Sequence, residues 1–251
     1  MAERQDSNWA AQLAAAQAWW REAGVDLAFA DAPTDWLAGA REKAVAPAAE
    51  SPVARTAPSV TAAPPARIGG DRAHWPPALA DFGAWWLTEP SLDSAPAARR
   101  VLPIGPPGAA LMVLVATPEP EDRETLLSGR QGRLIDAILK AFGTPRPEAY
   151  LASALPSHAP LADWAALAAN GMGEVLAHHI ALAGPQRLIV FGRDVSPLLG
   201  HDPAQAAQSS LRFNPYGLSV PLLYAPSLEA LLERPALKRA LWRRWLDWTG
   251  A

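Results

Sequence analysis

From Pro76 onward, short continuous apolar runs alternate with stretches whose apolar residues recur at helical spacing. The runs have the length of buried strands and lie at 109–116, 149–155, 187–191 and 219–224, with a further short strand expected at 99–103. The helical stretches follow Pro76-Pro77 and occupy about 131–142, 161–183 and 235–248, and a short helix opens at Gly192. This alternation predicts an α/β fold, a three-layer α/β/α domain around a central, mostly parallel, roughly four-stranded sheet.

The beginning of the chain has a different pattern. Asp6 or Ser7 suits the N-cap of a helix whose apolar residues are Trp9, Leu13, Ala16 and Trp20. A second short helix is expected after Thr34-Asp35. Residues 1–43 are therefore interpreted as an N-terminal helical segment. Two explanations stay open for its tryptophans: they are buried in a helical hairpin, or they dock onto a partner protein.

Residues 44–73 are rich in proline and in small side chains. Repeated prolines remove backbone donors and prevent regular helix, and the small residues offer little apolar surface to bury. This composition predicts a flexible linker. The expected organisation is a helical segment at 1–43, a linker at 44–73 and a domain at 74–251.

Composition narrows the range of functions. The 251 residues include 22 Lys and Arg against 25 Asp and Glu, and no cysteine. Absence of cysteine excludes disulfides, thiolate metal sites and a cysteine nucleophile. The slightly acidic total disfavours strong non-specific binding to nucleic acid. No apolar run approaches the ~20 residues of a membrane span, and no signal-peptide core is present, so we expect a cytoplasmic protein with no membrane partner.

Ligand sites in open parallel sheets lie in the loops that leave the carboxyl ends of the strands. In this chain those loops are 116–129, 153–160, 192–195 and 225–228. The first of them carries clustered carboxylates at Glu119, Glu121 and Asp122. These groups could act as general acid and base or bind a metal, or they could form a solvated acidic turn.

Among the histidines, His158 follows a central strand and is the best placed to act in catalysis. His178 and His179 are consecutive on a helix, so their side chains diverge by roughly 100° and cannot hold one ion together. The sequence contains neither a nucleophile elbow nor a phosphate-binding P-loop. No metal and no cofactor are expected. Lys238 and Arg239 lie on the last helix, where they would contact phosphates or form a solvated face.

Several segments carry a family resemblance. Val115–Asp122 follows a buried strand and precedes a G-x-x-G pattern at Gly129–Gly132, and the other matching segments are 185–193, Tyr224–Ser227 and 235–242. Over most of residues 76–251 the chain resembles the uracil-DNA glycosylase superfamily, and most closely its bacterial iron–sulphur branch. The resemblance implies that fold, a role in DNA repair by base excision, and two sets of site residues. The base pocket would be formed by Ala116, Pro118, Leu127, Ser153, Ala225, Pro226 and Ser227, and DNA would be contacted by Arg130, Arg193, Lys238 and Arg239.

The reactive residues of that family are replaced in this chain. The acidic residue of the first motif falls on Ala116, the base-reading asparagine on Ser153, and the histidine of the last motif on Ala225. The cysteines that hold the iron–sulphur cluster are absent, and we expect tryptophans to fill the space, namely Trp75, Trp85, Trp86 and Trp164.

The resemblance therefore implies a catalytically degenerate glycosylase-like protein that binds DNA, or binds a repair protein through residues 1–43. The alternative is an active glycosylase with relocated catalytic residues, drawn from Glu119, Glu121, Asp122 and His158, with Ser153 as a further base contact. A more remote alternative is a nucleotide-binding protein or another hydrolase that kept only the scaffold.

Overall fold

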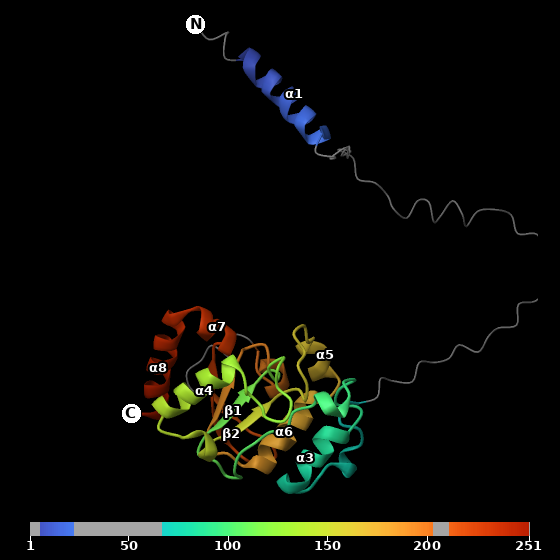
Figure 1. Cartoon of the computed structure of the whole chain (residues 1–251). Coiled ribbons are helices and arrows are strands. Elements are labelled where there is room, and N and C mark those ends of the chain that lie inside the picture. Colours follow the sequence, from blue (N-terminus) through green and yellow to red (C-terminus); the bar gives the residue numbers. More distant parts are fainter. Residues whose placement is uncertain (1–5, 23–66, 203–210, 251) are drawn as a thin grey trace, which may run out of the picture. The chain divides into compact units, whose positions relative to one another are not determined.

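The computed structural model describes residues 6–22, 67–202 and 211–250 (Figure 1). The chain divides into two compact units, 1–60 and 61–251. In the first unit, the helix α1 spans Asp6–Glu22 and exposes its aromatic residues, with Trp9 and Trp19 each 61% exposed and Trp20 51% exposed. The second predicted helix, after Thr34-Asp35, and the linker residues 44–66 lie outside the described residues.

The second unit is built on a five-stranded sheet with the order β2-β1-β3-β5-β4. Four strands are parallel: β1 (Met112–Val115), β2 (Tyr150–Ser153), β3 (Leu188–Phe191) and β5 (Val220–Ala225). The fifth, β4 (Leu211–Phe213), lies antiparallel at the edge. This arrangement confirms the predicted three-layer α/β/α fold. The sequence did not reveal β4, because its three residues include the exposed Arg212 and form no continuous apolar run.

Helices cover both faces of the sheet, and the alternation of side chains along each strand divides the core in two. On β1, Met112 and Leu114 pack toward one face, and Val113 and Val115 pack toward the other. The first face is covered by α3 (Leu79–Thr88), α5 (Trp164–Ala169) and α6 (Met172–Ala183). The second is covered by α4 (Arg130–Ala141), α7 (Leu228–Glu233) and α8 (Pro235–Thr249).

The structure corrects two of the predicted elements. No strand forms at 99–103: a 3-10 turn ends at Arg99, and the only pairing nearby among the described residues is an isolated bridge between Ile104 and Leu151. The predicted long helix at 161–183 is divided between α5 and α6. Gly171 stands between them with a φ of +102°, a left-handed conformation that interrupts the helix and that glycine adopts without strain.

The last residues of the predicted linker fold with the domain. Trp75 is buried, and its indole N–H donates to the carbonyl oxygen of Gly69 over 2.7 Å. The backbone N–H of Gly69 donates in turn to the hydroxyl of Ser91. A 3-10 turn follows at Arg72–His74. The folded domain therefore begins by Ile68, whose backbone N–H donates to Asn170.

Aromatic side chains from α3 fill the core beneath the sheet. Trp85 and Trp86 both pack against Phe82, and Phe82 stacks on the imidazole of His179 with ring centroids 4.1 Å apart. Next to them, the buried guanidinium of Arg100 donates to backbone carbonyls of the 86–95 segment. Aromatic burial and this hydrogen-bonded arginine stabilise the region.

Candidate functional site

The carboxyl ends of the four parallel strands lie in one row. Val115 at the end of β1 pairs in register with Ser153 on one side and with Phe191 on the other, and Phe191 pairs with Ala225. The chain leaves β1 toward β2 on one side, and β3 lies on the opposite side of β1. This is the point of an open α/β sheet at which the strand order reverses and ligands bind.

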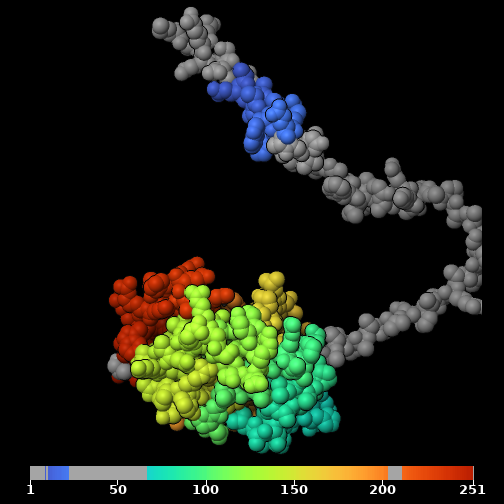
Figure 2. Space-filling model, viewed as in Figure 1, coloured from blue at the N-terminus to red at the C-terminus, as the bar shows by residue number. Residues whose placement is uncertain are grey.

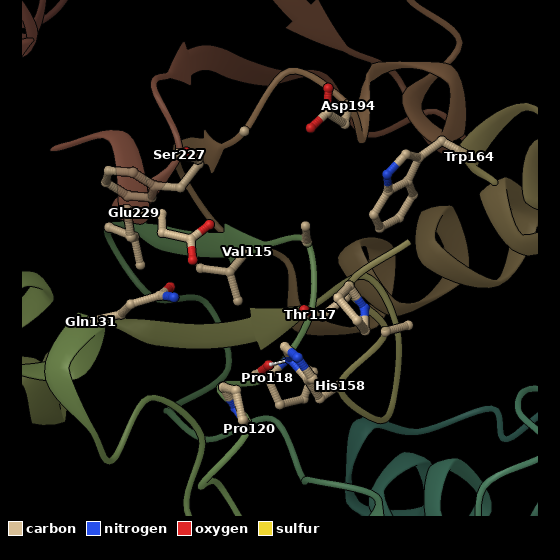
Figure 3. Close-up of a pocket in the computed structure, with 16 residues that line it drawn as sticks. Val115, Thr117, Pro118, Pro120, Gln131, His158, Trp164, Asp194, Ser227 and Glu229 are labelled. Carbon is tan, nitrogen blue, oxygen red and sulfur yellow. Dashed lines mark hydrogen bonds between the residues drawn. The ribbon is translucent and has the colours of Figure 1, made fainter. Parts of the chain in front are cut away.

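A cavity of about 350 Å³ lies at this point (Figure 3). Its volume falls within the ~300–1,000 Å³ of ordinary small-molecule pockets. In the space-filling view, the upper outline of the domain is notched between α7 and the gold-coloured α5, two elements that contribute to its wall (Figure 2). All four loops that follow the parallel strands contribute lining residues, which lie within 115–120, 158–160, 191–194 and 227–229.

Polar side chains from different elements converge on the cavity. They include Gln131 at the start of α4, His158 after β2, Asp194 after β3 and Glu229 in the first turn of α7. The half-buried Trp164 adds an aromatic wall from α5. Figure 3 shows the carboxylate of Glu229 and the amide of Gln131 turned into the cavity. The helices that carry these residues, α7 and α4, pack against each other.

The imidazole of His158 has a defined orientation. Its Nδ1 lies 2.8 Å from the carbonyl oxygen of Pro118. A carbonyl oxygen only accepts hydrogen bonds, so Nδ1 donates its proton there. In the neutral ring, Nε2 then keeps a lone pair available to a ligand.

The acidic loop has a structural role in this fold. The carboxylate of Glu119 is 4% exposed and accepts three backbone N–H groups at the start of α4. They belong to Gly129 at 2.9 Å, Gln131 at 2.7 Å and Gly132 at 3.1 Å. The first N–H groups of a helix have no partner within the helix, and its N-terminus favours a negative charge. Glu119 therefore caps α4 from a distant loop.

Asp122 organises the same loop from within. One oxygen accepts the backbone N–H groups of Glu119 and Leu127, each at 2.8 Å. The other accepts the backbone N–H of Ser128 at 2.8 Å and its hydroxyl at 2.7 Å. With four donors on a carboxylate that is 1% exposed, Asp122 has no acceptor site left for a reacting group.

The two glycines of the G-x-x-G pattern allow these close approaches. A Cβ on Gly132 would lie 1.8 Å from the carbonyl oxygen of Leu127, and one on Gly129 would lie 2.9 Å from the carboxylate of Glu119. Leu127 itself is held at a φ of +56°, which a leucine rarely adopts. The motif therefore packs a tight loop onto the start of α4.

The other sequence-predicted site residues fall into two groups. Ala116, Pro118 and Ser227 line the cavity, and Ser227 also caps α7 by accepting the N–H of Ala230. Five further residues do not line it: Leu127, Ser153 and Ala225 are buried, Pro226 is half-buried, and Glu121 is exposed. The hydroxyl of Ser153 donates to the carbonyl oxygen of Leu155 at 2.7 Å, so it is occupied within its own loop.

Two arginines are sequence neighbours of lining residues. Arg130 and Arg193 directly precede the lining residues Gln131 and Asp194. Burial lowers the pKa of the Arg244 guanidinium on α8. The positive charge of Arg193 lowers that pKa further, which indicates that the two arginines lie near each other. Lys238 and Arg239 are exposed on α8, and neither lines the cavity.

The sequence reasoning missed Gln131, Trp164, Asp194 and Glu229. Asp194 lies inside the loop 192–195 that the strand-end rule selects, and Glu229 lies one residue beyond 225–228. Their positions were therefore available from the sequence, but single acidic residues carry no motif. Gln131 lies two residues beyond the selected loop 116–129, and Trp164 begins a helix outside the selected loops, so neither stood out as a site residue.

Two negative findings apply to residues 6–22, 67–202 and 211–250. Within them, no group of three or more His, Cys, Asp or Glu side chains gathers where it could hold a metal ion. Within the same ranges, no helix has the length and apolar character that a bilayer span requires.

Comparisons with known proteins add no family assignment. The sequence matches no protein-family model, and a search of curated proteins finds no match either.

Proposed function

We propose that this chain is a uracil-DNA glycosylase-like protein that binds a nucleobase of DNA in the strand-end cavity without cleaving its glycosidic bond. Base-flipping proteins hold the extruded base in a pocket that contacts its polar edge and its ring face. The cavity offers polar groups at Gln131, Asp194 and Glu229 together with the ring of Trp164. The proposal also rests on the sequence resemblance at Val115–Asp122 and Tyr224–Ser227.

One observation carries the non-catalytic part of the proposal. The carboxylates nearest to the family's acidic position are those of Glu119 and Asp122, which accept three and four hydrogen bonds from backbone and hydroxyl donors. The positions where the resemblance expects a reactive acid and imidazole hold Ala116 and Ala225. Loss of a single electrostatic donor typically lowers a rate by ~10²–10³. The ordinary excision mechanism therefore lacks its principal groups.

The surroundings of the cavity fit a DNA ligand. Arg130 and Arg193 flank lining residues, and Arg244 lies near Arg193. The guanidinium groups of these arginines would neutralise backbone phosphates while the base enters the cavity. A protein that works on a bacterial chromosome in this way would be cytoplasmic.

The helix α1 would serve a separate purpose. Its exposed tryptophans at 9, 19 and 20 suit recruitment of a repair protein, since aromatic residues dominate protein-binding surfaces. Under this proposal, replacing Trp19 and Trp20 by alanine in the full chain leaves oligonucleotide affinity unchanged. A loss of affinity would assign α1 to DNA instead.

A relocated glycosylase is the second candidate, because His158 and Glu229 line the same cavity and both face solvent. Incubation of the full chain with single- and double-stranded DNA that contains one uracil separates the two candidates. We expect binding that weakens as salt rises and no release of uracil. Arg193→Gln should weaken binding and lower its salt dependence, whereas Arg212→Gln, on the edge strand β4, should not. Release of free uracil would favour the relocated glycosylase, and absence of any binding would contradict the DNA-binding proposal.

A further inference from the structure

The cavity carries negative rather than positive side chains. Asp194 and Glu229 are its carboxylates, and of the lining residues that the structure describes none is lysine or arginine. A carboxylate only accepts hydrogen bonds. A bound base must therefore present N–H donors toward these oxygens, and a base edge made mainly of carbonyl oxygens would be repelled.

The carboxylate of Glu229 differs from those of the acidic loop because its oxygens remain available. In the part of the chain that the structure describes, neither Glu229 nor Gln131 has a side-chain hydrogen-bond partner. Glu119 and Asp122 accept seven hydrogen bonds between them. The carboxylate oxygens that a ligand can use as hydrogen-bond acceptors are therefore those of Glu229. Asp194 contributes a second carboxylate on another wall of the cavity (Figure 3).

Glu229 and Gln131 together present a specific hydrogen-bonding pattern. The carboxylate of Glu229 offers two parallel acceptors, and the amide of Gln131, which lines the same cavity, offers an N–H₂ donor. Glu229 lies in the first turn of α7 and Gln131 in the first turn of α4, and these two helices pack together. Both side chains are turned into the cavity (Figure 3). The backbone of Gln131 is fixed in turn by the carboxylate of Glu119 at 2.7 Å. This pair suits a ligand edge with two adjacent donors beside one acceptor.

We infer that the cavity selects guanine, whose Watson–Crick edge has this arrangement. The N1–H and N2–H₂ groups would donate to the carboxylate of Glu229, and O6 would accept from the amide of Gln131. Uracil presents one N–H between two carbonyl oxygens, so it would leave a carboxylate oxygen facing a carbonyl. The inference rests on the proposed function, since it names the base that the same cavity binds.

The test uses the full chain and single-stranded oligothymidylates with one central guanine, hypoxanthine or uracil, compared by equilibrium binding at one salt concentration. Hypoxanthine is guanine without the N2 amino group. We expect the guanine strand to bind about tenfold or more tightly than either of the others, as a well-formed bidentate pair provides. Glu229→Gln should remove this preference. Glu233→Gln, an exposed acid at the other end of α7 that does not line the cavity, should keep it.

The outcomes are distinguishable. If none of the strands binds, the proposed DNA-binding function itself is wrong. If all strands bind but guanine has no advantage, or Glu229→Gln keeps the advantage, the inference is wrong while the proposed function stands. If N-acetyl-arginine amide competes with the guanine strand and binds more tightly, the cavity accepts an arginine side chain of a protein, and the inference is overturned. Urea unfolding of each variant confirms that the exposed substitutions leave the fold intact.

Discussion

Replacing Asp122 by asparagine tests the structural role of the acidic loop. In the wild-type chain, one carboxylate oxygen accepts two backbone N–H groups, and the other accepts an N–H and a hydroxyl. An asparagine keeps the shape but turns an N–H₂ group toward one of these sets. The less costly orientation turns it toward Ser128, whose hydroxyl can rotate to accept from it, so that only the backbone N–H of Ser128 loses its acceptor and meets another donor.

The expected loss of stability follows from these contacts. A hydrogen bond to a charged group contributes about 1.5–3 kcal/mol, so the loss of this one corresponds to roughly 1.5–3 kcal/mol. A domain is stable by about 5–15 kcal/mol in total. With a urea dependence of about 1–3 kcal/mol per molar, a loss of 3 kcal/mol lowers the unfolding midpoint by about 1–3 M. Glu119→Gln should cost a similar amount, because its amide group need face only the N–H of Gln131.

The assay is urea unfolding at neutral pH, followed by the fluorescence of the buried tryptophans. Glu121→Gln is the matched control, since Glu121 is an exposed acid of the same loop and surface changes usually shift stability by only about 0.5 kcal/mol. If Asp122→Asn unfolds at the same urea concentration as Glu121→Gln, the structural role assigned to Asp122 within this loop is wrong. A catalytic role would show the opposite pattern, with activity lost and stability kept.

The remaining predictions concern the loop glycine, the aromatic core and a buried histidine. Gly132→Ala should destabilise the domain by about 1–3 kcal/mol or more, because the new Cβ would lie 1.8 Å from a backbone carbonyl oxygen. In the same unfolding assay the control Gly83→Ala, inside α3, should be neutral or stabilising. Trp86→Ala should cost about 3–5 kcal/mol and leave much of the domain unfolded by circular dichroism, and a fully folded variant would contradict its core role. Burial lowers the pKa of His179 from 6.5 to about 3, and the charge of neighbouring His178 adds to this shift. Between those pH values the unfolded chain binds one more proton than the folded chain, so the free energy of unfolding should fall as pH drops from about 6.5 toward 3, by up to about 1.4 kcal/mol per pH unit. The same pH titration of His179→Leu should lack that contribution. Tyr150→Phe should cost about 1–3 kcal/mol, because it leaves the imidazole Nε2 of His179 without its partner at 2.8 Å, and an unchanged urea midpoint would contradict that hydrogen bond.

The layered architecture was predictable because the central strands are visible in the sequence as continuous apolar runs. The residues of β1 and β3 are all buried, and strands covered on both faces read as continuous apolar runs. The edge strand β4 could not be found in this way, since Arg212 at its centre is exposed and donates to Ser219 rather than packing in the core. At 99–103 apolar residues are present, but Val101 donates its backbone N–H to Pro156 and no strand forms beside it.

The location of the cavity followed from topology, whereas the roles of its side chains did not. The strand-end rule selected the loops that line it, and His158 does lie there. Sequence reasoning could not foresee that Glu119 and Asp122 turn away toward backbone N–H groups, because those partners are as many as 13 residues away and depend on the loop geometry. Nor could spacing show that Gln131 and Glu229 line one cavity, since 98 residues separate them and the two helices that carry them come together only in the fold.

The central claim is that this chain binds DNA in the strand-end cavity without cleaving a glycosidic bond. Its most direct test is a single-turnover experiment, with protein in excess over single-stranded DNA that contains uracil and all four normal bases, and free bases quantified by mass spectrometry. We expect the DNA to stay bound throughout and no base to be released above a protein-free control. Release of any base by the wild-type chain, abolished by Glu229→Gln or by His158→Ala, would contradict it.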